Sequence, residues 1–175
     1  MDSEHIDRSQ LRESDADCQV LFIYICAFAM EYSVSNSALA AANRWSIFLQ
    51  TSTDESVRLD IFRGRNNDGL TGTLTLVSVN EVYPDDVLRV MMFRTLGQPT
   101  VKLLVETLVG KGREKYQFTQ DERGGRYWVY TVVSDWEEAE FLPVGSAETA
   151  KADLTLCWHA GGSFPIEIVP GIFYN

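Results

Sequence analysis

The alternation of apolar and polar residues first predicts a sheet. Residues 20–30 (VLFIYICAFAM) are rich in β-branched and aromatic side chains, which is typical of a strand buried on both faces. Arg44–Gln50 predicts a second strand. In residues 56–62 the apolar positions alternate with Arg58 and Asp60, which favours a hairpin partner that has one polar face.

The following segments extend the sheet and mark its turns. Residues 70–79 alternate leucines with threonines, and another short apolar strand is predicted near residues 87–93. Residues 32–43 are rich in Ser, Ala and Asn, which indicates a loop with room for one helical turn at residues 38–42. Residues 63–69 (RGRNNDG) are a strong turn signal.

Two helices are predicted where the apolar period changes to 3.6 residues. Thr100 is placed as an N-cap, and the first helix ends at Gly110 and Gly112. The second and longer helix is predicted over residues 126–141, with Asp135 and three glutamates on its solvent side. Segments 154–158 and 165–169 are interpreted as late strands or an extended tail. The apolar faces comprise Val101, Leu104, Val105 and Leu108, then Trp128, Val129, Val132, Val133 and Trp136.

This order of elements predicts one α+β domain. The chain has 175 residues, an ordinary size for a single domain, and the strands precede the main helices. We expect an antiparallel sheet packed against two main helices over residues 18–175. Residues 1–17 hold six acidic residues against Arg8 and Arg12, so they supply −4 of the formal charge of −10. We interpret them as an acidic arm that is mobile or loosely docked.

The composition of the chain argues against some classes of binding partner. The chain has 25 acidic and 15 basic residues and no basic stripe, which argues against nucleic acid and against anionic membranes. Its three cysteines are widely spaced and no signal peptide is visible, so we expect reduced thiols in the cytoplasm. The oligomeric state stays open.

A set of short motifs in residues 20–142 resembles a family of uncharacterised small fungal proteins. The family pattern is Asn-His-Trp-Ser, then Ser-Val-Arg-x-Asn-Met, then Gly-Cys-Arg-x-Trp. The matching residues here are Asn43 to Ser46, Ser56 to Asp60 and Gly124 to Trp128, accompanied by Gly69 to Leu74 and Gly112 to Tyr116.

That pattern is in turn similar to circularly permuted NlpC/P60 proteins, a papain-like group. The resemblance implies a His on a strand, a polar orienting residue on the next strand and a Cys at a helix N-terminus, where thiolate is favoured. Arg44 stands at the His position, Asp60 (or Arg58) at the polar position and Gly125 at the Cys position. Neither Arg nor Gly can replace nucleophile or base, so the chain is not expected to be a cysteine hydrolase.

The candidate site is the cleft in which the missing Cys and His side chains would have met. Arg44, Arg58, Asp60 and Arg126 either line it or form a structural ion-pair group. Arg44 and Asp60 are the catalytic candidates, because a fixed cation polarises a carbonyl or holds a carboxylate. The substrate-binding candidates, of which the two tryptophans are equally well explained as core, are Tyr24, Trp45, Arg58, Gly125, Arg126 and Trp128.

Other reactive residues are weaker candidates. Cys157 and His159 share a face of a strand, but no orienting residue suggests itself, and a buried thiol beside a surface imidazole is the simpler interpretation. With His5 and His159 as the only histidines, a His-rich metal site is excluded. We expect no cofactor, although carboxylate-only Mg²⁺ or Ca²⁺ binding stays an alternative.

Three functions remain open. The first is a cofactor-independent cyclase or isomerase of fungal secondary metabolism, of the Diels–Alder type for example, which folds an apolar small molecule within a shaped cavity. The second is a non-catalytic module, derived from the hydrolase-like fold, that binds a small molecule or a protein. The third is a hydrolase or transferase that uses Cys157 or another nucleophile.

Overall fold

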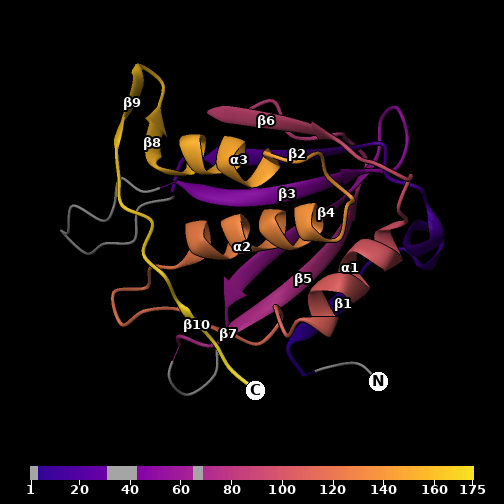
Figure 1. Cartoon of the computed structure of the whole chain (residues 1–175), viewed down its shortest axis with the longest axis horizontal. Helices are drawn as coiled ribbons and strands as arrows, with labels where there is room; N and C mark the ends of the chain where they lie inside the picture. Colours follow the sequence, from indigo (N-terminus) through magenta and orange to yellow (C-terminus); the bar gives the residue numbers. More distant parts are fainter. Residues whose placement is uncertain (1–3, 31–42, 65–68) are drawn as a thin grey trace.

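The chain folds around one six-stranded sheet (Figure 1). The computed structural model describes residues 4–30, 43–64 and 69–175. Four consecutive strands form an antiparallel meander, and the sheet order is β1-β5-β4-β3-β2-β6. The strands are β1 (Ile6–Gln10), β2 (Phe22–Phe28), β3 (Arg44–Gln50), β4 (Ser56–Arg63), β5 (Gly72–Val79) and β6 (Arg89–Arg94).

The predicted strands are confirmed, with small shifts at their ends. Alternation fixes them because each strand directs every second side chain to the same face. In β4, Val57 and Leu59 are fully buried on one face, whereas Arg58 points to the other. The expected loop at residues 32–43 lies, except for Asn43, outside the described residues, as does most of the expected turn at residues 63–69.

The N-terminal acidic segment was predicted to be a mobile or loosely docked arm, and the structure places it in the sheet instead. β1 runs parallel to β5, with Ile6 opposite Leu74 and Asp7 opposite Thr75. A 3₁₀ helix, η1 (Glu13–Asp17), follows. Arg12 anchors this region, since its Nε lies 3.0 Å from Asp15 Oδ2 and its Nη1 lies 2.9 Å from Glu55 Oε1.

Three helices cover one face of the sheet (Figure 1). The two predicted helices are confirmed, and Thr100 caps the first by accepting a hydrogen bond of 3.1 Å from Leu103 N. The third helix was not predicted. Its first turn is capped by the Glu137 carboxylate, which accepts from Gly145 N and Ala147 N at 2.8 and 2.6 Å. The helices are α1 (Val101–Gly110), α2 (Gly125–Glu138) and α3 (Ser146–Leu154).

Asp135 corrects another expectation. It was placed on the solvent side of its helix, but it is only 4% exposed. Its carboxylate accepts from Arg113 Nε at 2.6 Å and lies 3.2 Å from Lys111 Nζ. These contacts tie the C-terminal end of α2 to the segment that follows α1.

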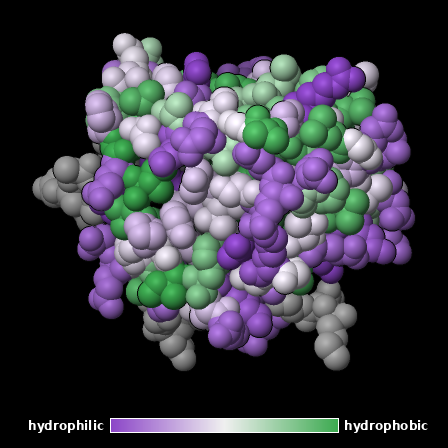
Figure 2. All heavy atoms as spheres, viewed as in Figure 1, coloured by the Kyte–Doolittle hydropathy of each residue, from purple (hydrophilic) through white to green (hydrophobic). Residues whose placement is uncertain are grey.

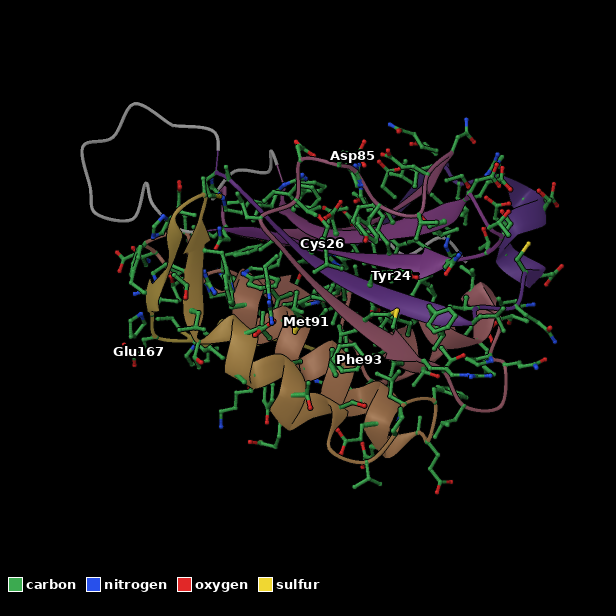
Figure 3. All side chains as sticks on the ribbon, turned by 90° about the horizontal axis from the view of Figure 1, so that it is seen from above. Tyr24, Cys26, Asp85, Met91, Phe93 and Glu167 are labelled. Atoms are coloured by element: carbon green, nitrogen blue, oxygen red, sulfur yellow. The ribbon has the colours of Figure 1, made fainter. Side chains whose placement is uncertain are left out.

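The main core lies between the sheet and the helices. Trp128 and Trp136 on α2 are at most 1% exposed and pack with Ile47 and Leu59 of the sheet. Figure 3 shows Met91 and Phe93 directed toward the helices, whereas Tyr24 and Cys26 lie toward the segment that carries Asp85. That opposite face holds a smaller cluster of Cys26, Phe28 and Phe48, against which Tyr83 and Val87 pack.

Short strands complete the molecule at its margin. The expected late strands are found in part, since β8 (Leu156–His159) pairs with β9 (Gly162–Pro165), and β10 (Ile172–Phe173) pairs with β7 (Tyr116–Gln117). On the helix-covered side, apolar atoms appear as several groups with hydrophilic atoms between them (Figure 2). No helix in the described part of the chain is long and apolar enough to cross a bilayer.

Candidate functional site

The helix-free face of the sheet carries a buried charged cluster. Arg58 and Asp60 are two residues apart on β4, so both point to this face. The Ser46 hydroxyl donates a hydrogen bond to Asp60 Oδ1, and Arg58 Nε lies 2.8 Å from Asp60 Oδ2. The second contact is an ion pair with poor alignment, because neither atom makes a well-directed hydrogen bond. Asp60 is thus fixed between a hydroxyl and a guanidinium.

Asp60 has an unusual electrostatic environment. Its side chain is 3% exposed, and burial raises its pKa above the ordinary value, because a desolvated carboxylate is disfavoured. The hydrogen bond from Ser46 and the charges of Arg58 and Arg44 oppose this shift without cancelling it. A buried carboxyl with a raised pKa is a frequent feature of functional sites, and also of structural ion pairs.

Arg44 and Tyr24 share this face but lie at its margin. The Arg44 guanidinium carbon lies 4.8 Å from the centre of the Phe28 ring. The Tyr24 hydroxyl donates to Gln50 Oε1 at 3.2 Å, and its ring centre lies 5.0 Å from that of Tyr83. Both residues therefore have partners that explain their position.

A shallow groove lies beside the charged cluster, between β1, β5 and β4. It offers about 120 Å³, well below the roughly 300–1,000 Å³ of sites that enclose drug-sized ligands. Among the predicted residues, Arg58 reaches it, with a side chain that is 27% exposed. The groove is lined by Asp7, Ser9, Gln10, Arg58, Phe62, Thr75, Leu76 and Val77.

The remaining predicted residues lie on the helix-covered side, so the expected convergence of Arg44, Asp60 and Gly125 on one concavity does not occur. Trp45 and Trp128 are 7% and 1% exposed members of the main core. Gly125 begins α2, and a Cβ added there would meet nothing within 4 Å. The sheet itself separates this group from Asp60.

Arg126 is held by hydrogen bonds within the fold and does not lie in an open site. Its Nη1 donates to the carbonyl oxygens of Leu154 and Leu156 at 2.7 and 2.8 Å, and its Nη2 donates to Asn43 Oδ1 at 3.2 Å. Its guanidinium also stacks over the Trp45 ring, and burial lowers its pKa to about 10. The buried guanidinium thus joins α2, the end of α3, β8 and the start of β3.

Gly124 is the glycine of the turn whose freedom the fold requires. Its φ is 135°, and an added Cβ would approach the Tyr116 hydroxyl to 2.7 Å. That hydroxyl donates to Gly124 O at 2.7 Å and accepts from Gly171 N at 2.9 Å. The packing of Tyr116 therefore explains the glycine at position 124 but not the one at position 125.

Two of the three cysteines, Cys26 and Cys157, are buried, which disfavours their use as nucleophiles. Burial raises the pKa of Cys26 to about 12. Cys157 is 1% exposed, whereas His159 is exposed and accepts from Gly161 N through its own Nδ1 at 3.2 Å. This matches the interpretation of a buried thiol beside a surface imidazole. Within the described ranges, no group of three or more His, Cys, Asp or Glu side chains is arranged to hold a metal ion.

The sequence interpretation missed Ser46 and the contribution of β1. Ser46 is completely buried on the helix-free face, where an isolated serine in an apolar strand could have indicated a buried polar partner. Asp7, Ser9 and Gln10 enter the groove only because β1 pairs with β5, and nothing in a polar pentapeptide predicts that pairing. Their contribution follows from tertiary structure alone.

The comparison with protein families covers most of the chain. A family model for a domain of unknown function, DUF7770, matches residues 23–174. The chain therefore belongs to the DUF7770 family. No curated protein and no solved structure matches it.

Proposed function

We propose that this member of the DUF7770 family is a non-catalytic module that binds a small molecule on the helix-free face of its sheet. One observation carries the proposal: Arg58 lines the groove while buried Asp60 holds its Nε. A guanidinium has five N–H donors, so fixing it through Nε leaves the terminal amino groups for a ligand oxyanion. Preorganisation by a buried carboxylate lowers the entropic cost of binding.

The groove favours binding over catalysis. Asp60, the group with the raised pKa, does not line it, so a ligand in the groove contacts Arg58 rather than a proton donor. Asp7 does line it, but hydrogen bonds from Ser9 lower the pKa of Asp7, which makes it a poor base. A ligand held this way meets a cation and apolar contacts but no activated nucleophile.

A titration of the whole ¹⁵N-labelled protein with isovalerate tests this proposal. We expect amide shifts concentrated on β4 and β5 around Arg58, and their loss in Arg58→Gln. Arg94→Gln is the matched control, because Arg94 is an exposed arginine on the opposite edge strand. Shifts that persist in Arg58→Gln, or that spread evenly over the surface, would contradict binding at this site.

The second candidate function is a cofactor-independent cyclase or isomerase of fungal secondary metabolism, including pericyclic closure of an apolar substrate. The raised pKa of Asp60 favours it, since a protonated carboxyl can donate a hydrogen bond to a carbonyl. Arg44 would then polarise the substrate from the same face. If the protein is such an enzyme, Asp60→Asn abolishes turnover and leaves substrate binding intact. If it is a binding module, Asp60→Asn and Arg58→Gln change ligand affinity alone.

The proposed origin is a degenerate NlpC/P60-like, papain-like fold acting in the cytoplasm. The order of strand, strand and helix supports this origin, as does a glycine at the N-terminus of α2 where the resemblance places a cysteine. The outward direction of Arg44 speaks against a simple replacement of the ancestral pair. Free thiols at all three cysteines agree with a reducing compartment, and cell fractionation would test it.

A further inference from the structure

The groove between β1 and β4 presents two opposite charges that do not neutralise each other. Arg58 lines one side and Asp7 lines the other. The register places Asp7 opposite Thr75 and Arg58 opposite Val77, so β5 lies between the two charged residues. In the part of the chain that the structure describes, no ion pair or hydrogen bond joins them.

Arg58, the positive end of the groove, is held by a buried carboxyl group. Arg58 Nε lies 2.8 Å from Asp60 Oδ2, and the Ser46 hydroxyl fixes the other oxygen of that carboxyl. The ion pair with the buried Asp60 restrains the Arg58 side chain through charge rather than through a well-directed hydrogen bond. The guanidinium is therefore a preorganised donor for a planar carboxylate.

The negative end is formed differently. Asp7 is exposed, and its Oδ1 accepts a hydrogen bond of 2.8 Å from Ser9 N. The Ser9 side chain also interacts with this carboxylate, which is fully exposed and can accept from a further donor in the groove. Since the contacts from Ser9 lower the pKa of Asp7, the carboxylate is ionised at neutral pH.

We propose that the ligand of this groove is a small zwitterion whose carboxylate meets Arg58 and whose ammonium group meets Asp7. The inference rests on the proposed binding function and specifies its ligand. The net charge of −10 supports it, because the field of an acidic protein repels a free anion but not a neutral zwitterion. Phe62 and Val77 supply apolar contact for the remainder of the ligand, whereas the Leu76 side chain lies in the core on the other face of the sheet.

The size of the groove limits that remainder. Its space of about 120 Å³ equals roughly four water molecules at about 30 Å³ each. Such a space fits a free amino acid with a short apolar side chain better than a peptide or a polycyclic molecule. L-valine is therefore the probe, and isovalerate and isobutylamine are its analogues without the ammonium and without the carboxylate.

The experiment is an NMR titration of the full-length ¹⁵N-labelled protein with each of the three probes. We expect valine to bind about tenfold or more tightly than either analogue, since each analogue lacks one of the two charged contacts. Arg58→Gln should weaken valine and isovalerate alike. Asp7→Asn should bring valine down to the affinity of isovalerate, and Arg94→Gln should change nothing.

Two results would overturn the inference, and they differ in what else they reject. Equal affinities for valine and isovalerate, unchanged by Asp7→Asn, would reject the zwitterion while leaving the binding function intact. If none of the three probes shifts the amides of β4 and β5, the proposed binding site fails as well. Asp7 is exposed, so Asp7→Asn retains the fold even if Arg58→Gln does not, and the amide spectrum itself reports folding.

Discussion

The two faces of the sheet use the same strands but are stabilised in different ways. On the helix-covered face, Ile47, Leu49 and Leu59 are fully buried against apolar helix surfaces. On the opposite face, the residues next to Ile47 and Leu59 in the sequence are Ser46 and Asp60, which are also buried but polar. The helix-covered face stabilises the fold because its apolar area is removed from water. On the helix-free face, the hydrogen-bond and ion-pair partners offset the cost of desolvating the polar groups. The helix-free face therefore combines a small apolar cluster with buried polar groups, and the proposed binding site depends on those polar groups.

Removing a large side chain from the core should separate the two faces most clearly. Trp136 is fully buried, and Trp136→Ala is expected to lower the free energy of unfolding by about 3–5 kcal/mol. Phe62→Ala is the counterpart on the helix-free face, where Phe62 is 37% exposed, and its cost is expected to be about 1 kcal/mol or less. Urea unfolding of both variants measures this. Equal losses would mean that the helix-free face contributes as much to stability as the core does.

Two arginines at the start of β3 sharpen the same comparison, since Arg44 is its first residue and Arg126 bonds to Asn43 just before it. Arg126→Met removes three hydrogen bonds and leaves buried carbonyl oxygens unpaired, so we expect a loss of roughly 2–4 kcal/mol. Arg44→Met removes the contact with the Phe28 ring and a charge that acts on Asp60, but no printed hydrogen bond, and should cost about 0.5–1 kcal/mol. Thermal and urea unfolding provide the test. A larger loss for Arg44→Met would show that Arg44 is the structural residue of the pair.

Asp60 allows the helix-free face to be tested by pH. Its pKa is raised above 3.8 in the folded protein, so the folded state binds the proton more tightly than the unfolded state does. The associated stability is fully present below pH 3.8 and is lost as the pH rises through the raised pKa. We therefore expect wild-type protein to lose stability relative to Asp60→Asn as the pH increases above 3.8.

Asp7→Asn is the control for that measurement, because the pKa of Asp7 is shifted in the opposite direction. Its contribution is present above pH 3.8 and is lost as the pH falls through the lowered pKa. Urea unfolding of the three proteins over the range from about pH 3 to 8 compares the two slopes. If Asp60→Asn runs parallel to the wild type throughout, burial does not dominate the titration of Asp60.

Much of this fold could be predicted because local patterns agree with it. Alternation located the meander strands, and Thr100 marked the start of α1. The missed helix α3 buries Ser146, Ala150 and Leu154, a set with a single large apolar side chain, so its apolar period is weak. Its cap comes from Glu137 on another helix. The pairing of β1 depends on a distant strand and has no local signal. Long-range contacts decided both elements.

The error in the site has a simpler cause. A displacement of one residue along a strand moves a side chain to the opposite face. The motif comparison placed Arg44 beside Gly125, but Trp45, Ile47 and Leu49 form the apolar series that faces the helices, and Arg44 belongs to the other series. The period of β3 therefore contained the information that the motif comparison ignored. The expected grouping of Arg58 with Asp60 is found, and Arg44 lies on the same face, where its charge acts on Asp60.

The smallest expected effect tests this separation of the two positions directly. A cysteine fits at position 125, where an added Cβ meets nothing within 4 Å, and the helix N-terminus favours its thiolate. We expect Gly125→Cys to react with an alkylating reagent at a rate that the addition of Arg44→His changes by less than about twofold, because the imidazole lies beyond the sheet and cannot act as its base. Reaction rates of the single and double variants, followed by mass spectrometry of the modified peptide, provide the measurement. A rate increase of about tenfold or more in the double variant, with a titration near the ordinary imidazole pKa, would place positions 44 and 125 in one site and restore the papain-like arrangement.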